Sequence, residues 1–139
     1  MENTGIESRM QKEIILVVED DEQYRKLICE ILRAEGYTIL DACNGEEALQ
    51  LCKSKKLQVD LLFTDVIMPR MDGVTLSERL VILLPKMKVI FSSGYTEKSK
   101  LLRNVENEEI NFIEKPYDPS TLLKKVANVL RAPFPQLPS

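Results

Sequence analysis

Short apolar runs alternate with amphipathic segments five times along the chain, and each run has the length of a β-strand. Residues 14–18 are continuously apolar and mostly β-branched, which is typical of a strand covered on both faces. We expect this run to form the central strand. The other runs predict strands at residues 37–40, 59–64, 89–92 and 110–114.

The segments between these runs carry apolar residues at helical spacing. The first helix, which Gly36 can end in a left-handed conformation, is expected to bury Tyr24, Leu27, Ile28, Ile31 and Leu32. The second begins at an N-cap formed by Asn44 with Glu47, and its inward residues are Ala48, Leu49, Leu51 and Cys52. The third, which ends at Pro85, is expected to pack through Leu76, Leu80, Leu83 and Leu84.

Two further helices complete the pattern. The fourth, at residues 97–105, has few apolar positions among many charges and is expected to be the least firmly packed. The last begins at Asp118 with Pro119 in its first turn, and its inward residues are Leu122, Leu123, Val126, Val129 and Leu130. Five strand-helix units predict an α/β domain in which helices cover both faces of a parallel sheet.

Length and composition support one soluble domain. The 139 residues, 44% hydrophobic and 29% charged, suit a single globular unit, which we place at residues 13–131. Residues 1–12 are then an N-terminal tail and residues 132–139 a Pro-rich tail or linker. A net charge of −3 is unsuited to a dedicated nucleic-acid binder, so we expect no direct DNA binding. No apolar run is long enough for a membrane span or a signal peptide, and a cytoplasmic location is expected.

Composition also limits the chemistry. The chain has no histidine, so it can form no Ser-His-Asp or Cys-His device and no histidine metal site. If it takes part in phosphoryl transfer through histidine, that histidine belongs to a partner. The cysteines, Cys29, Cys43 and Cys52, are odd in number and lack C-x-x-C spacing, so we interpret them as reduced, structural thiols.

Polar residues follow four of the predicted strands. They are Glu19-Asp20-Asp21, Thr64-Asp65, Ser92-Ser93-Gly94 and Glu114-Lys115-Pro116. Each group alone can be explained as a helix cap, a turn or an exposed charge. In a parallel sheet, however, the carboxyl ends of the strands share one edge, which is where such folds place their sites. The groups would therefore meet.

Clustered carboxylates raise one another's pKa unless a cation neutralises them, and Mg²⁺ prefers such oxygen ligands. Beside a cation, Asp65 can act as a nucleophile that accepts a phosphoryl group. Lys115 would offset the charge of that group, and the Ser93 hydroxyl could donate a hydrogen bond to it.

With these residues in place, the chain resembles the receiver domains of two-component response regulators over residues 13–131. The resemblance rests on Val17-Val18-Glu19-Asp20, on the run from Asp60 to Pro69 around Asp65, and on Met71-Asp72-Gly73, Ser93-Gly94 and Lys115-Pro116. It implies a flavodoxin-like fold with strand order 2-1-3-4-5. It also implies a signalling role, in which a histidine kinase or phosphotransfer domain donates a phosphoryl group and an unknown downstream protein reads the result.

The resemblance also implies residue roles. Asp65 is the phosphoacceptor, and Mg²⁺ is held by Asp20, Asp65 and the main-chain carbonyl of Ile67, with Glu19 acting through water. Ser93 and Phe112 match the switch positions, and Lys115 matches the family's lysine, whose bond to Pro116 is expected to be cis. Ile67 and Tyr95 stand where side chains influence the lifetime of the phosphorylated state.

Finer details are similar to receivers attached to hybrid histidine kinases, in particular Ser93-Gly94-Tyr95-Thr96 and the run from Asn111 to Tyr117. Glu19 and Ser93 depart mildly from the commoner aspartate and threonine. No ATP-binding glycine box, helix-turn-helix or output domain follows, so we expect a free-standing receiver or a piece of a larger protein. Its only catalysis would be its own phosphorylation and dephosphorylation.

Three alternatives stay open at this point. An aspartyl-phosphate phosphohydrolase of the haloacid-dehalogenase type would need an acid-base aspartate where this chain has Ile67. A flavodoxin-like flavin or nucleotide binder would need a phosphate-cradling loop where this chain has Glu19, Asp20 and Asp21. A receiver that has lost phosphorylation is disfavoured because each required residue is present.

Overall fold

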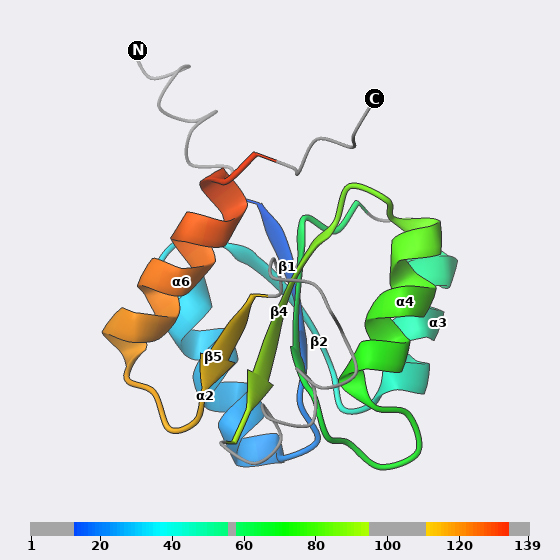
Figure 1. The fold of residues 1–139 in the computed structure, drawn as a ribbon, viewed down its shortest axis with the longest axis horizontal. Coiled ribbons are helices and arrows are strands. Elements are labelled where there is room, and N and C mark those ends of the chain that lie inside the picture. The colour runs from blue at the N-terminus through cyan, green and yellow to red at the C-terminus, as the bar shows by residue number, and fades with distance from the viewer. Residues whose placement is uncertain (1–12, 56–57, 95–110, 134–139) are drawn as a thin grey trace.

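A computed structural model describes residues 13–55, 58–94 and 111–133. Its elements alternate along the chain with the strands running in one direction (Figure 1). They are β1 (Ile14–Val18), α2 (Glu22–Ala34), β2 (Thr38–Ala42), α3 (Gly45–Lys55), β3 (Leu61–Asp65), α4 (Gly73–Leu83), β4 (Lys88–Ser93), β5 (Phe112–Glu114) and α6 (Pro119–Arg131). The predicted helix at 97–105, Tyr95, Ile110 and both predicted tails except residues 132–133 lie outside the described residues.

The strands form one parallel sheet in the order β2-β1-β3-β4-β5, which confirms the predicted flavodoxin-like topology. β1 is an interior strand, paired to β2 on one side and β3 on the other, but the middle strand of the five is β3 and not β1 as we expected. Helices α2 and α6 cover one face of the sheet and α3 and α4 cover the other (Figure 1). The core is therefore two apolar layers separated by the sheet.

The predicted helix ends are formed as the sequence indicates. The Asn44 side chain accepts a hydrogen bond from Glu47 N at 2.8 Å, while the Glu47 carboxylate accepts one from Cys43 N. Asp118 caps α6 by accepting from Thr121 N at 2.8 Å. Gly36 has a φ of 103°, which is the left-handed conformation expected after α2.

Two predicted core positions are wrong. Leu27 is 51% exposed, whereas Cys29 on the same helix is buried. Leu27 and Cys29 each lie about 100° around the helix axis from the buried Ile28, but in opposite directions. The core covers the side of the helix that carries Cys29, so Leu27 is left toward solvent. Leu83 is 45% exposed because it is the last residue of α4, and Leu84, just beyond the helix, packs against the core in its place.

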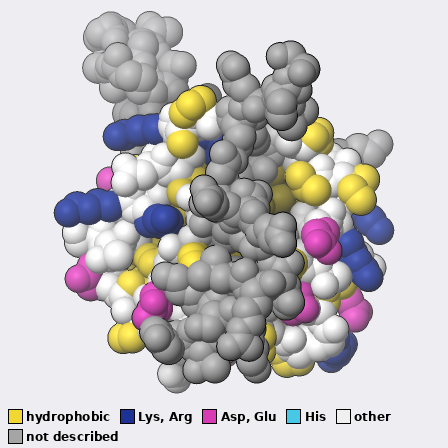
Figure 2. All heavy atoms as spheres, in the orientation of Figure 1, with side chains coloured by type: hydrophobic (Ala, Val, Ile, Leu, Met, Phe, Trp, Pro, Cys, Tyr) yellow, Lys and Arg dark blue, Asp and Glu magenta, His cyan; other side chains and the backbone are white. Residues whose placement is uncertain are grey.

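The observed strands differ slightly from the predicted ones. β2 and β3 each extend further toward the carboxyl end than expected, so Asp65 is the last residue of β3 instead of the first after it. Charged side chains of both signs are interspersed over the described part of the face in Figure 2. Within the three described stretches, no helix has the length and apolar character to span a membrane.

Candidate functional site

The carboxylates predicted to meet do meet. Glu19 and Asp20 follow β1 and Asp65 ends β3, and these two strands are parallel neighbours with Val18 opposite Thr64. One oxygen from each of the three carboxylates lies within 4.8 Å of the others. Glu19 and Asp65 are buried, at 3% and 7% exposure, while Asp20 faces solvent. The strand register thus builds one acidic pocket at the carboxyl edge of the sheet.

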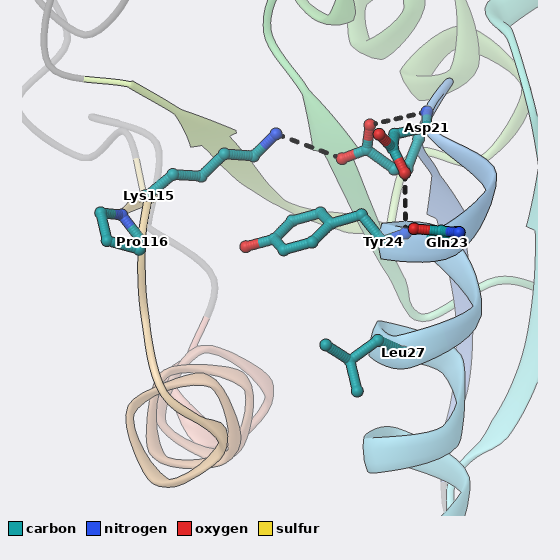
Figure 3. Close-up of a pocket in the computed structure, with 7 residues that line it drawn as sticks. Asp21, Gln23, Tyr24, Leu27, Lys115 and Pro116 are labelled. Carbon is teal, nitrogen blue, oxygen red and sulfur yellow. Dashed lines mark hydrogen bonds and ion pairs between the residues drawn. The ribbon is translucent and has the colours of Figure 1, made fainter.

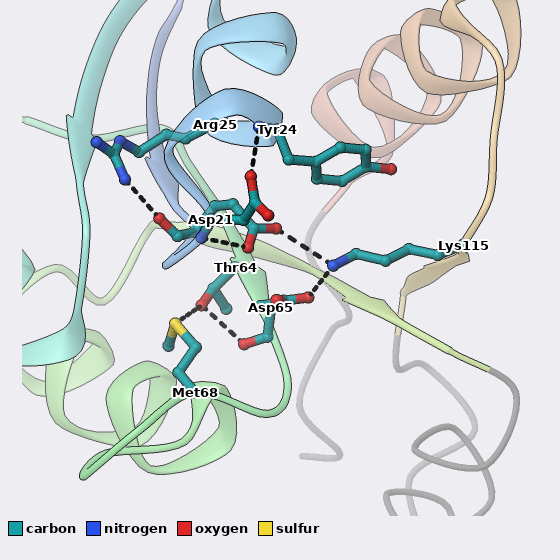
Figure 4. A network of polar contacts seen from close by, with 8 residues as sticks. Asp21, Tyr24, Arg25, Thr64, Asp65, Met68 and Lys115 are labelled. Carbon is teal, nitrogen blue, oxygen red and sulfur yellow. Dashed lines mark hydrogen bonds and ion pairs between the residues drawn. The ribbon is translucent and has the colours of Figure 1, made fainter.

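Lys115 reaches the same pocket from beyond β5. Its Nζ atom lies 2.8 Å from Asp65 Oδ1 and 3.2 Å from Glu19 Oε1 (Figure 4). The backbone N–H of Lys115 donates to Ser93 O at 2.8 Å, which fixes where the side chain begins. The peptide bond to Pro116 is cis, as the resemblance led us to expect. Lys115 is therefore the cation shared by two buried carboxylates.

The sequence did not indicate what orients Glu19. Its Oε2 atom accepts from Asp21 N at 3.1 Å, and its main-chain carbonyl accepts from Arg25 Nη1 at 2.8 Å. Arg25 also pairs with Asp41 on β2, with 3.0 Å between Nε and Oδ2. Asp21 itself caps α2 by accepting from Tyr24 N at 2.9 Å, so it belongs to the helix more than to the pocket. The sequence shows an arginine one turn into the helix, but that alone does not indicate this link.

The backbone of Asp65 is held by the segment that leads into α4. Gly73 N donates to Val66 O at 2.7 Å, and Thr64 Oγ1 donates to Asp65 O at 3.0 Å. A Cβ atom at Gly73 would lie 2.1 Å from Asp65 O, so only glycine fits this approach. The sequence pattern indicates Gly73 only as part of a turn. Its structural role is to let α4 begin directly against the residue at the centre of the pocket.

The remaining predicted site residues surround this centre. Ser93 ends β4 and is fully buried, and its hydroxyl has no hydrogen-bond partner among the described parts of the chain. Phe112 is half-buried on β5 opposite Phe91 and packs against the small cluster of Val66 and Phe91. Ile67 is 50% exposed beside the pocket. The Ser93 hydroxyl is thus a buried polar group at the end of the strand next to the one that carries Asp65.

The charges in the pocket are poorly balanced. Burial raises the pKa of Glu19 to about 7, with the Asp65 charge adding to the effect, although hydrogen bonds from Asp21 N and Lys115 oppose it. Burial also raises the pKa of Asp65 above its usual range, against the opposing effect of Lys115. Burial acts to lower the pKa of Lys115, but hydrogen bonding and charge from Asp65 and Glu19 raise it overall.

The pocket suits a hard divalent cation. Three carboxylates converge where Lys115 supplies a single positive charge, so a further cation would reduce the repulsion among them. The donor set consists of oxygens, which is the ligand type of Mg²⁺. The residues present therefore fit the predicted cofactor.

An open groove of about 610 Å³ adjoins the pocket on the side of α2 (Figure 3). It is lined by Glu19, Asp21, Gln23, Tyr24, Leu27, Lys115 and Pro116. Tyr24 extends from α2 toward Lys115, whose Nζ atom lies 4.9 Å from the centre of the ring. The helical stripe predicted Tyr24 as a core residue, and no local pattern indicates its contact with a lysine far along the chain.

Comparisons with known proteins agree with this geometry. The family model of the response regulator receiver domain matches residues 15–127. The chain is 34% identical to the sensor kinase CckA of Brucella abortus over 116 residues, which are 84% of this chain and 12% of that protein. It is 32% identical to the chemotaxis protein CheY of Treponema pallidum over 118 residues, which are 84% of this chain and 82% of that protein. The chain thus spans most of the chemotaxis protein but a small part of the sensor kinase.

Solved structures give the same result. The receiver domain from the hybrid histidine kinase CckA has a TM-score of 0.71 at 35% identity, covering 85% of this chain and 99% of that one. A two-component transcriptional regulator AraC from Clostridium phytofermentans has a TM-score of 0.72 at 34% identity, with 86% and 97% covered. The similarity to receivers of hybrid kinases, noted in the sequence, is therefore confirmed.

Proposed function

The chain belongs to the response regulator receiver domain family, and from this premise we propose that it is a phosphoacceptor signalling module in which Asp65 receives the phosphoryl group. The observation that carries the proposal is the Asp65 carboxylate, which is buried beside Glu19 and Asp20 and held by Lys115 at 2.8 Å. The buried hydroxyl of Ser93, which has no hydrogen-bond partner among the described residues, completes a set of groups suited to a phosphoryl group.

The reaction needs a donor because this chain has no histidine. A carboxylate oxygen of Asp65 forms a bond to the phosphorus of a partner's phosphohistidine, and the phosphorus-nitrogen bond breaks. The electron pair of that bond returns to the imidazole nitrogen. Lys115 stabilises the charge on the transferring phosphoryl oxygens, and its position is set before the donor arrives by Asp65 and Glu19. The donor is a histidine kinase or a phosphotransfer domain.

We assign the Mg²⁺ site to Asp20, Asp65 and the main-chain carbonyl of Ile67, with Glu19 contributing through water. When bound, the ion would neutralise the carboxylates and the phosphoryl oxygens. Asp20 faces solvent and offers the entry side of the site, while Glu19 and Asp65 form its buried side.

The phosphorylated state would be read at the surface. Ser93 donates its hydroxyl hydrogen to a phosphoryl oxygen, and Phe112, which is half-buried against Phe91, turns inward into the space that Ser93 leaves. The face that changes includes β5 and α6, and by family resemblance also the predicted helix at residues 97–105, which lies outside the described residues. An unidentified downstream protein recognises this face, and the chain contributes neither DNA binding nor an enzymatic output of its own.

No observation favours the alternative of a phosphohydrolase. The position two residues after Asp65 is Ile67, whose side chain is half-exposed and cannot exchange a proton. A nucleotide or flavin binder is not favoured either, because β1 is followed by carboxylates that would repel phosphate.

The test is self-phosphorylation from acetyl phosphate in the presence of Mg²⁺, followed by intact mass. We expect the wild-type chain to gain one phosphoryl group and Asp65→Asn to gain none. Asp72→Asn is the matched control, since Asp72 caps α4 outside the pocket and asparagine caps equally well. Phosphorylation of Asp65→Asn at the wild-type yield would overturn the assignment.

A further inference from the structure

Lys115 makes a third contact that does not involve a carboxylate. Its Nζ atom lies 4.9 Å from the centre of the Tyr24 ring, which belongs to the first turn of α2 (Figure 3). We propose that Tyr24 is a positioning residue whose ring holds the Lys115 ammonium over the phosphorylation site. The inference rests on the proposed function, because it assigns what keeps the lysine of that site in place.

Lys115 needs such a restraint. Its side chain is 28% exposed and borders the groove of about 610 Å³, so the flexible stem has room to turn away from Asp65. The Glu19 and Asp65 carboxylates contact the ammonium at 3.2 and 2.8 Å. The face of an aromatic ring carries negative electrostatic potential and attracts a cation. Tyr24, which lines the same groove, therefore adds a restraint on Lys115 that the carboxylates do not supply.

The ring is itself fixed from two directions. The Asp21 carboxylate accepts a hydrogen bond from Tyr24 N at 2.9 Å, which holds the backbone of Tyr24 at the start of α2. The Tyr117 ring meets the Tyr24 ring edge-on, with 5.9 Å between centres and 61° between planes. Tyr117 in turn packs edge-on against Phe63, which is buried in β3 two residues before Asp65. A row of aromatic rings thus ties Tyr24 to the strand that carries the phosphoacceptor.

Because the Tyr24 ring is uncharged, it can keep its contact with Lys115 while the charges at Asp65 change during the reaction. When the Asp65 carboxylate becomes an acyl phosphate, it loses the negative charge that Lys115 contacts at 2.8 Å. The new negative charge resides on the phosphoryl oxygens, and the ammonium must turn toward them. The attraction of the Tyr24 ring does not depend on the charge of Asp65. The ring can therefore hold Lys115 before, during and after transfer.

The direct test is an NMR measurement on the unphosphorylated protein. We expect the Lys115 ε-methylene protons to show contacts with the Tyr24 ring protons and an upfield shift from the ring. Tyr24→Phe should retain the shift and Tyr24→Leu should remove it. Absence of these contacts in the wild-type chain would overturn the inference without a variant, and independently of whether the chain is phosphorylated.

The functional test compares phosphorylation rates at fixed acetyl phosphate and Mg²⁺. A cation-π contact of this kind corresponds to roughly a two- to fivefold change, so Tyr24→Leu should be slower by about that factor. Tyr24→Phe should react at the wild-type rate. Leu27→Ala is the matched control, since Leu27 lines the same groove from the same helix and has no ring to attract the ammonium.

Mg²⁺ affinity should be the same in all three variants. A rate unchanged in Tyr24→Leu, or lowered equally in Tyr24→Phe, would overturn a role for the ring. If even the wild-type chain is not phosphorylated, the proposed function fails, and the NMR contacts still decide whether Tyr24 holds Lys115.

Discussion

At the level of single residues, Asp20 and Asp21 are neighbours with different roles. Asp20 shares the pocket with Glu19 and Asp65, whereas Asp21 caps α2 through Tyr24 N. We expect Asp20→Asn to weaken Mg²⁺ binding about tenfold or more, because it removes a charged ligand. Asp21→Asn removes the same charge but preserves the cap, so it should leave the affinity nearly unchanged. A magnesium titration of both variants that gave equal affinities would contradict this assignment.

The side chains near the phosphorylated aspartate set a second expectation. Ile67 is half-exposed beside Asp65 and offers no hydrogen bond to an attacking water. By family resemblance Tyr95, which lies outside the described residues, stands on the same path. Because hydrolysis needs a water held in line with the phosphorus, we expect a comparatively long-lived phosphorylated state.

Phosphate-release rates at fixed Mg²⁺ test this lifetime. Ile67→Asn and Tyr95→Glu should each release phosphate faster than the wild-type chain, since each adds a group that can hold a water. Rates that stay the same or fall in both variants would refute the water-access argument, even if Asp65 is the phosphoacceptor.

Some site residues follow from sequence and others do not. Strand ends fall at apolar-to-polar boundaries, so the amino-acid pattern alone is enough to place Glu19, Asp20, Asp65 and Lys115 together. The contacts of Arg25 with the Glu19 carbonyl and of Tyr24 with Lys115 could not be predicted in this way, because each depends on the rotation of a helix around its axis. That rotation is decided by packing against the sheet.

Among the elements, β3 and α4 meet at a close junction. Gly73→Ala would place a Cβ atom 2.1 Å from Asp65 O, where backbone must move. We expect a loss of about 1–3 kcal/mol in the free energy of unfolding, together with slower phosphorylation, because the carboxylate of Asp65 moves with its backbone.

Gly45→Ala provides the comparison for this substitution. The three atoms nearest to its Cβ atom would all belong to the Met71 side chain, none closer than 2.7 Å, and a methionine side chain can shift more easily than backbone, so the loss should be smaller. Denaturant unfolding measures both losses. A Gly73→Ala variant as stable and as active as Gly45→Ala would show that the approach of α4 is not critical.

The strand order and most helix faces were predictable because hydrophobic spacing reports burial directly. The errors at Leu27 and Leu83 have a common origin. Both residues lie at the margin of an apolar stripe, Leu27 at its side and Leu83 at its end. Spacing identifies the centre of such a stripe well, but only the neighbouring elements determine how wide the covered part is.

For the molecule as a whole, the reactivity of the cysteine thiols measures how often the fold opens. Burial raises the pKa of Cys29 to about 11 from its ordinary 9.0 and raises the pKa of Cys52, while Cys43 is half-exposed. At pH 8 we expect a thiol reagent to modify Cys43 first and the other two only when the fold opens. In Cys43→Ser only the slow modification of Cys29 and Cys52 should remain. In denaturant all the thiols should be modified rapidly.

The raised pKa of Cys29 also determines whether stability rises or falls with pH. Because the pKa of Cys29 is higher in the folded state, the unfolded chain releases this proton first as pH rises. The contribution of Cys29 to stability is therefore complete below about pH 9 and falls as pH approaches about 11. Denaturant unfolding between about pH 8 and about pH 11 measures this fall, and a stability whose pH dependence is unchanged in Cys29→Ala would contradict it.

The ammonium of Lys88, at the start of β4, binds the main-chain carbonyls of Val129, Leu130 and Ala132 at the end of α6. This fastens the last helix at the amino edge of the sheet, where β1 also begins. The acidic pocket occupies the opposite edge. A chain attached to a solid support through a peptide joined before Ile14 or after Arg131 would therefore present Asp65 outward, so a phosphoryl donor in solution could reach it from the free side.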